Sequence, residues 1–154
     1  MQKSWKKTSH HYLLTRWLST EKIEKPTTVQ IEVPVNIDAF AYEVLNLVNN
    51  YRIENGLGTL TWNQGLADAA AIRSAEAAVC WSHTRPDGSA WNTVSNLTHG
   101  ENLGKGYNSP QDVVNAWKSS PSHNANLLES RFKTLGVAYT LNEKGYVWAQ
   151  EFGY

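Results

Sequence analysis

Apolar side chains recur at helical spacing in the stretch that follows Asp38. One face of this predicted helix carries Phe40, Val44, Leu47, Val48 and Tyr51. The Asp38 side chain is suited to cap the helix N-terminus, and Asn55-Gly56 is typical of a helix end. The pattern therefore predicts an amphipathic helix that begins after Asp38 and ends at Asn55.

A second helix is predicted to follow Asn63, which is another suitable N-cap. Small side chains on this helix allow a neighbouring layer of backbone to approach closely; they belong to Ala67, Ala71, Ala75 and Ala78. Cys80 follows the helix and is the chain's one cysteine, which excludes an intrachain disulfide. We expect Cys80 to be a small, buried apolar group.

Two further helix starts lie in the second half of the chain. Ser109-Pro110-Gln111-Asp112 combines an N-cap serine, a proline at the first helical position and an acidic residue at the third. Ser120-Pro121 repeats the serine-proline signal and places His123 in the first turn of another helix. Trp117, on the first of these helices, is expected to be buried.

The C-terminal stretch alternates in the manner of a β-hairpin. One strand carries Leu135, Val137, Tyr139 and Leu141, residues 142–145 form the turn, and residues 146–152 return. Neither strand has a cleanly polar face, so we expect helices to cover both faces of a small sheet.

The first 37 residues have a different character. They begin with an amphipathic pattern between Tyr12 and Leu18, which predicts a short helix, and Pro26 and Pro34 then indicate a linker or extended arm. Residues 1–30 carry an excess of four positive charges and the remainder an excess of four negative charges. A basic amphipathic segment of this kind can rest on an anionic surface or dock on its own domain. We therefore divide the chain into an extension (1–37) and a folded domain (38–154).

Composition narrows the classes of protein further. The 154 residues suit one domain with a substantial core, and the net charge of zero gives no general case for a nucleic-acid partner. The sequence has no stretch of ~20 apolar residues that could span a bilayer. It also has no signal-peptide pattern, so the chain is either a mature or excised piece or is not secreted by that route.

Candidate chemistry is concentrated in three short motifs. They are Ser82-His83-Thr84-Arg85-Pro86-Asp87-Gly88, Gly100-Glu101-Asn102-Leu103 and Ser120-Pro121-Ser122-His123. Two imidazoles and a carboxylate can bind a divalent cation or transfer protons. A helix N-terminus at His123 favours its neutral ring, the form that binds metal. His83 and Glu101 are 18 residues apart, and Glu101 and His123 are 22 residues apart. This spacing alone does not identify a metal or catalytic site.

In this order the motifs resemble the CAP superfamily, also known as the SCP-like or cysteine-rich secretory, antigen 5 and pathogenesis-related 1 group. The resemblance covers residues 38–154, includes the closing Trp148-Ala149-Gln150-Glu151-Phe152-Gly153, and is strongest for the cysteine-poor bacterial branch. It implies an α+β fold: a three-layer α-β-α sandwich around a small, mainly antiparallel sheet. It also implies an extracellular or cell-envelope location and a cleft that contains His83, Glu101 and His123.

One part of the family pattern is missing. Family members carry a second glutamate shortly after the tryptophan of the third helix, but here Trp117-Lys118-Ser119-Ser120-Pro121 contains no acidic residue. Ser119 and Ser120 lie nearest to the missing position, and we include both in the expected ligand cleft. Fewer carboxylates imply weaker cation binding and one candidate base fewer. Glu151 has a weaker claim, and we expect it simply to end a strand.

Three functional hypotheses follow. The first, which we favour, is a secreted or envelope binding module, without established catalysis, whose cleft holds a lipid-like or peptide ligand. A Zn²⁺ or other divalent cation, bound weakly by His83, His123 and Glu101, is compatible with this role but not required, and we expect a monomer. The second hypothesis is a metal-dependent hydrolase or peptidase with Glu101 as base. The third is a structural or adhesive domain with a vestigial triad.

Overall fold

The computed structural model describes residues 38–154, and the predicted helix and arm of the extension lie outside the described residues. The elements, in chain order, are α1 (Ala39–Glu54), β1 (Thr61–Trp62), α2 (Gln64–Val79), a short 3-10 helix (Trp91–Val94), β2 (Gly100–Lys105), α3 (Pro110–Ser119), α4 (Pro121–Leu127), β3 (Thr134–Asn142) and β4 (Gly145–Gly153). Every helix predicted within residues 38–154 and both predicted strands of the hairpin are present.

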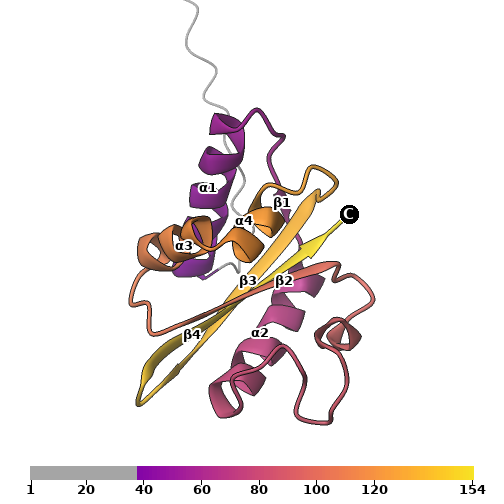
Figure 1. Cartoon of the computed structure of the whole chain (residues 1–154), viewed down its shortest axis with the longest axis vertical. Helices are drawn as coiled ribbons and strands as arrows, with labels where there is room; N and C mark the ends of the chain where they lie inside the picture. The colour runs from indigo at the N-terminus through magenta and orange to yellow at the C-terminus, as the bar shows by residue number, and fades with distance from the viewer. Residues whose placement is uncertain (1–37) are drawn as a thin grey trace, which may run out of the picture. The chain divides into compact units, whose positions relative to one another are not determined.

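The four strands form one sheet in the order β1-β3-β4-β2 (Figure 1). β3 and β4 are the predicted antiparallel hairpin, β2 is antiparallel to β4, and β1 is parallel to β3. The sheet is therefore mainly antiparallel, as the sequence predicted.

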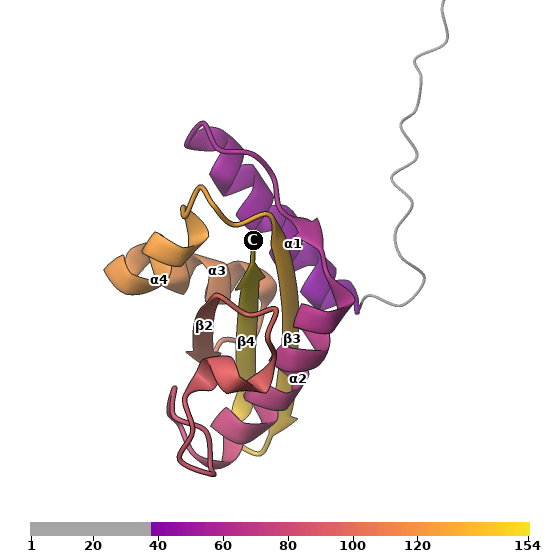
Figure 2. The ribbon, with the colours of Figure 1, turned by 90° about the vertical axis from the view of Figure 1, so that its right-hand side faces the viewer.

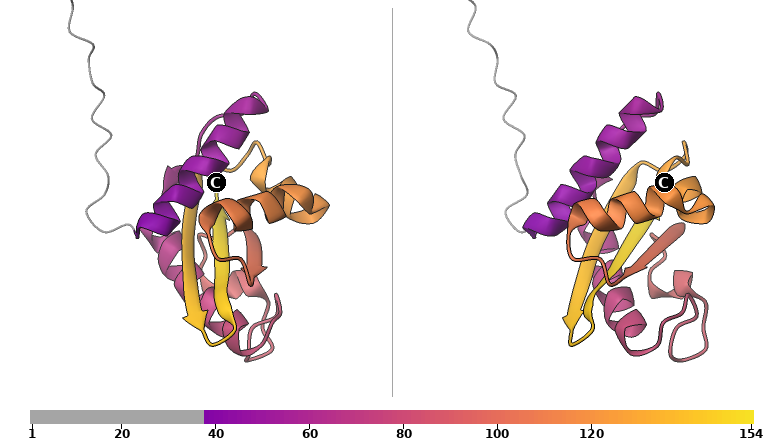
Figure 3. Two further views of the ribbon diagram at one scale, coloured as in Figure 1. Left: turned by 90° about the vertical axis from the view of Figure 1, so that its left-hand side faces the viewer. Right: turned by 60° about the vertical axis from the view of Figure 1, so that its left-hand side comes forward.

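Helices cover both faces of this sheet. α2 packs on β3 and β4 from one side, whereas α1, α3 and α4 pack together on the other side, with α1 on β3 and both α3 and α4 on β2. Figure 2 shows α3 and α4 next to β2, and Figure 3 shows α1 and α3 in front of the strands with α2 behind. The three-layer α-β-α sandwich is confirmed.

Side-chain caps start α1, α2 and α3 where the sequence predicted, whereas α4 begins at Pro121 without a side-chain cap from Ser120. Asp38 Oδ1 accepts hydrogen bonds from the backbone N–H groups of Phe40 (2.9 Å) and Ala41. Asn63 caps α2 through the Leu66 N–H, and Ser109 caps α3 through the Asp112 N–H. These bonds satisfy donors that would otherwise lack partners in the first turn.

The closest approach between the layers occurs where α2 crosses β3. A Cβ atom added to Gly136 would lie 2.1 Å from the Ala67 nitrogen, so only glycine fits there. Ala67 therefore acts as predicted, but Ala71 and Ala75 face solvent. Arg73 and Ser74 instead face the sheet with the buried alanines of α2. Cys80 is exposed, which corrects the expectation that it would be buried.

Trp117→Ala should lower the free energy of unfolding by ~3–5 kcal/mol, as for other large-to-small changes in a core. The Trp117 side chain is only 1% exposed, and its indole N–H donates to the Leu103 carbonyl at 2.9 Å. Denaturant titration measures the loss. Trp81→Ala is the control, because Trp81 is largely exposed, and it should cost about 1 kcal/mol or less. Equal losses would contradict this account of the core.

Gly136→Ala should destabilise the domain by about 1–3 kcal/mol or more, because the added methyl group meets backbone atoms that cannot move independently. Gly58→Ala is the matched control, since its Cβ would have no neighbour within 4 Å and its φ lies outside the left-handed region. Thermal unfolding of the two variants should separate them clearly. A neutral Gly136→Ala would show that α2 can move away from β3 at little cost.

Candidate functional site

Glu101 is the centre of the candidate site. It lies on β2 with its side chain toward α2 and only 1% exposed. Its Oε2 atom is 2.7 Å from Arg73 Nε, and its Oε1 atom is 3.2 Å from Arg73 Nη2. Oε1 also lies 2.7 Å from His83 Nδ1. Both carboxylate oxygens are therefore engaged by cationic or polar partners inside the protein.

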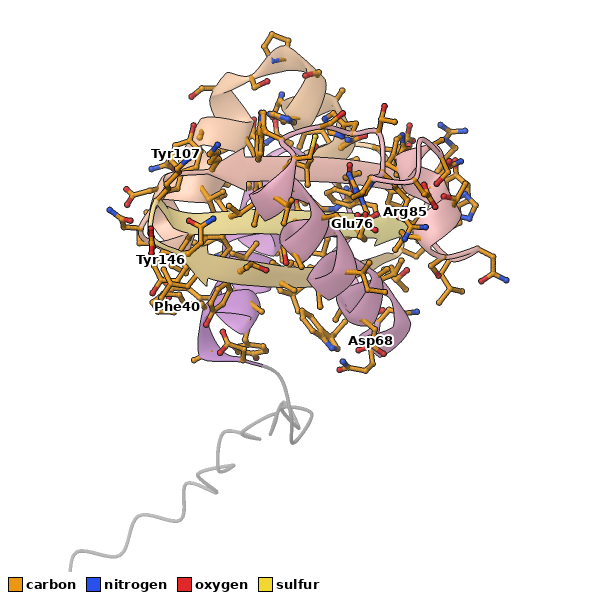
Figure 4. All side chains as sticks on the ribbon, turned by 90° about the horizontal axis from the view of Figure 1, so that it is seen from below. Phe40, Asp68, Glu76, Arg85, Tyr107 and Tyr146 are labelled. Atoms are coloured by element: carbon orange, nitrogen blue, oxygen red, sulfur yellow. The ribbon has the colours of Figure 1, made fainter. Side chains whose placement is uncertain are left out.

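Arg73 links this carboxylate to the loop that carries His83. The guanidinium is fully buried and donates to the Ser82 carbonyl at 2.9 Å, one residue before His83. It also pairs with Glu76, which in turn pairs with Arg85 at 2.8 Å (Figure 4). Burial lowers the pKa of Arg73, but its bonds to Glu101 and Glu76 outweigh burial and raise it. Arg73 therefore restrains the loop that carries His83 in two ways: directly at the Ser82 carbonyl, and through Glu76 at Arg85.

The orientation of His83 follows from these contacts. Because Nδ1 faces the Glu101 carboxylate, Nδ1 carries the proton of a neutral ring and leaves the Nε2 lone pair free. The His83 side chain is 53% exposed, so this nitrogen has access to solvent ligands. The predicted turn after His83 is present, with Gly88 at a φ of +84° and its N–H bonded to the Arg85 carbonyl.

His123 lies in the first turn of α4, as predicted, and is half-buried. Its pKa is lowered by burial and, to a smaller extent, by the charge of His83. The neutral ring is thus favoured, although burial rather than the helix terminus is the main cause. The electrostatic influence of one histidine on the other indicates that the two rings are near each other.

An asparagine network fixes the position of α4 against β2. Asn126 donates to the Glu101 carbonyl (3.1 Å) and to the Asn102 side chain (2.9 Å). Asn102 donates to the His123 carbonyl (3.2 Å) and to the Gln150 side chain (3.1 Å). The backbone of His123 is therefore held relative to the strand that carries Glu101.

Glu151 is a member of this site that sequence reasoning missed. It lies directly opposite Glu101 in the β2–β4 register, is fully buried, and accepts a hydrogen bond from the Thr98 hydroxyl. Burial and then the interaction with Glu101 raise the pKa of Glu151 to about 10. The expectation that Glu151 simply ends a strand is wrong: it is a buried, neutral acid beside Glu101, and its Oε1 atom has no hydrogen-bond partner within residues 38–154.

The two acids have opposite protonation states. Burial raises the pKa of Glu101, but the hydrogen bonds from His83 and Arg73 and the charge of Arg73 together outweigh burial and hold the pKa below its usual range. Glu101 is therefore ionised, and Glu151 is its protonated neighbour. Within residues 38–154, no three or more His, Cys, Asp and Glu side chains are grouped as metal ligands.

The hydroxyl groups of Ser119 and Ser120 contact groups other than Glu101 and Arg73. The Ser119 hydroxyl donates to the Asn115 carbonyl at 2.9 Å, and Ser119 lines a separate hollow of about 400 Å³ with Tyr107 and Asp112. Ser120 places its hydroxyl 3.4 Å from that of Ser122. The structure thus brings His83 and Glu101 into contact and His123 nearby, whereas a cleft shared with Ser119 and Ser120 stays a prediction.

Comparison with known proteins identifies the family. Residues 45–152 match the CAP family, described as the cysteine-rich secretory protein family, and the chain belongs to it. An uncharacterized protein of Bacillus subtilis (strain 168), YkwD, is 31% identical over 134 residues, which are 82% of this chain and 51% of the relative. The chain thus spans about half the length of this curated relative.

Solved structures share the fold. An extracellular SCP-domain protein of Bacillus anthracis superposes with a TM-score of 0.65 at 25% identity, covering 73% of this chain and 39% of that one. An outer surface protein of Borrelia burgdorferi gives 0.63 at 20% identity, covering 71% and 88%. No helix within residues 38–154 has the length and apolar character needed to cross a membrane.

Glu151→Gln should raise stability at neutral pH. The pKa of Glu151 is higher in the folded than in the unfolded chain, so the folded state holds an extra proton between pH 4.5 and about 10. Stability therefore falls as pH rises through this window. Glutamine is neutral throughout and can donate to Glu101, so the gain should be ~1–3 kcal/mol at pH 7 and should shrink toward zero near pH 4.

Urea titrations across this pH range measure the difference between the variant and the wild type. Glu143→Gln is the control, because Glu143 is exposed in the β3–β4 turn, and its effect should be small and nearly independent of pH. Parallel stability curves for wild type and Glu151→Gln would show that Glu151 is ionised in the folded protein.

Proposed function

We propose that the protein is an extracellular or cell-envelope binding module whose ligand contacts the imidazoles of His83 and His123. The location is supported by the B. anthracis and B. burgdorferi structures, which are described as an extracellular and an outer surface protein. A peptide or lipid-like molecule with a polar group facing the two rings is the ligand class we favour.

The observation that carries this proposal is the state of Glu101. A hydrolase with Glu101 as general base needs a carboxylate that can reach water and accept its proton. Both Glu101 oxygens are instead bonded to Arg73 or His83, the side chain is almost fully buried, and its pKa is lowered. These features favour a binding role for the site over hydrolysis.

A divalent cation fits the two histidines better than it fits the full triad. His83 Nε2 and a ring nitrogen of His123 would be the protein ligands, and Glu101 would orient His83 by accepting from Nδ1. Carboxylates commonly hold metal-binding histidines in this way. A cation there would supply positive charge and open positions for an anionic group of the ligand. With only two protein ligands we expect weak binding.

Titration calorimetry with zinc tests the metal part of the proposal. Zinc should bind weakly at neutral pH and be released at acidic pH, because a protonated imidazole cannot coordinate. His83→Ala and His123→Ala should each abolish binding. His99→Ala is the matched control, since His99 is exposed and stacked on Tyr154, and it should bind like the wild type.

Acidic substitutions near the family's missing glutamate provide a second test. Ser120→Glu or Ser119→Glu should tighten zinc binding if either side chain reaches the histidines. Unchanged affinity in both histidine-to-alanine variants would place the metal elsewhere, and the binding module would then act without a cation at this site.

A further inference from the structure

The outer edge of β3 is mostly unpaired within residues 38–154. β1 pairs only with Thr134 and Leu135, after which the chain turns into α2. β3 continues to Asn142, and over this length the described residues provide a strand partner on the β4 side alone. Over residues 136–142, the edge of β3 that points away from β4 therefore has no neighbouring strand within residues 38–154.

The register shows which backbone groups point outward. Thr61 N–H donates to the Lys133 carbonyl and Asn63 N–H to the Leu135 carbonyl, both at 2.9 Å. Odd-numbered residues therefore face the β1 side, because backbone groups alternate along an antiparallel strand. By this alternation, the N–H and C=O groups of Val137, Tyr139 and Leu141 point to the unpaired edge. Those of Ala138 and Thr140 point to β4.

A hollow of about 370 Å³ follows this edge between the helical layers. It is lined by residues at the start of α1, at the end of β1, on α2 and on β3: Asp38, Ala41, Trp62, Gln64, Ala67, Asp68, Ala71 and residues 137–139. Figure 4 shows Phe40 of α1 and Asp68 of α2 beyond β3, on the side of the sheet opposite Tyr107. Alanines of α1 and α2, together with the larger Trp62 and Gln64, thus border a slot along a strand edge.

The features that usually protect an exposed edge are missing from this stretch of β3. Proteins block such edges with proline, lysine or bulges, whereas residues 136–142 contain none of these residues and keep a continuous register with β4. Leu141 is 63% exposed. The charged residues that line the slot are both acidic, Asp38 and Asp68.

We propose that this slot is a strand-addition site for an extended peptide of alternating apolar residues that carries lysine or arginine. Val137 is buried, so the outward groups of Tyr139 and Leu141 would supply the main-chain hydrogen bonds, as in other complexes of this kind. Apolar side chains of the peptide pack against the accessible Ala71 and Trp62, and Asp38 and Asp68 attract the basic ones. The site lies at the sheet edge opposite β2 and is separate from the histidine site.

Amide hydrogen exchange of the full chain tests whether the edge is free. In the protein alone, the amides of Tyr139 and Leu141 should exchange rapidly, while those of Ala138 and Thr140, bonded to β4, should be protected. The probe acetyl-Lys-Val-Thr-Val-Thr-Val-Lys-amide should then protect the first pair by about tenfold or more. Protection without the peptide would mean that another segment or a second copy already occupies the edge, and it would overturn the proposal.

N-methylated peptides separate strand addition from general stickiness. Only alternate amides of a bound strand face β3. We therefore compare two peptides, one methylated on its three valine amides and the other on its two threonine amides. One of the two should bind about tenfold more weakly than the probe, and the other should bind like the probe. Equal affinity of both peptides would overturn the proposal.

Protein variants complete the test by fluorescence anisotropy of the labelled probe. Leu141→Pro removes one outward N–H without removing a β3–β4 bond, and should weaken binding by about tenfold, whereas Leu141→Ala should change it by about twofold at most. Asp68→Asn should weaken binding mainly at low salt. If Leu141→Pro binds as tightly as Leu141→Ala, β3 does not pair with the peptide.

Discussion

The buried ion pair between Arg73 and Glu101 is the constraint on which the site depends. It joins the middle of α2 to β2 and, through the Ser82 carbonyl and His83, fixes the loop between these elements. Burying two charges is costly unless their hydrogen-bonding groups are satisfied. Arg73 meets this condition with bonds to Glu101, Glu76 and Ser82. Loss of Arg73 would leave the Glu101 carboxylate buried without its main counter-ion.

Glu101 and Glu151 show how one environment gives two acids different roles. They lie side by side on neighbouring strands, but Arg73 and His83 reach Glu101, whereas Glu151 meets the Thr98 hydroxyl. One acid is therefore ionised and the other is neutral, which limits the buried negative charge to a single unit. The same arrangement restrains His83 and leaves Glu101 poorly suited to remove a proton from water.

Local signals in the sequence were sufficient for the helices and the hairpin. Asp38, Asn63 and Ser109 cap helices because capping depends on residues two or three positions apart. The family motifs also indicated that His83 and Glu101 belong together. The roles of Arg73 and Glu151 depend on how α2 lies on the sheet and on the β2–β4 register, which no local pattern encodes. Alternation did offer one signal, because Glu151 shares a strand face with the buried Val147 and Ala149.

The two edges of the sheet are covered differently within residues 38–154, and this difference suits them to different roles. At β2, Asn102 and Asn126 bind α4 to the strand, so the edge is held under a helix that carries His123. At β3, the helices stand apart because α1 and α2 pack on opposite faces, and within residues 38–154 no comparable network lies over Tyr139 and Leu141. A rigid, polar edge suits a site that positions two imidazoles. An accessible backbone edge between alanines and aspartates suits a ligand that supplies its own strand.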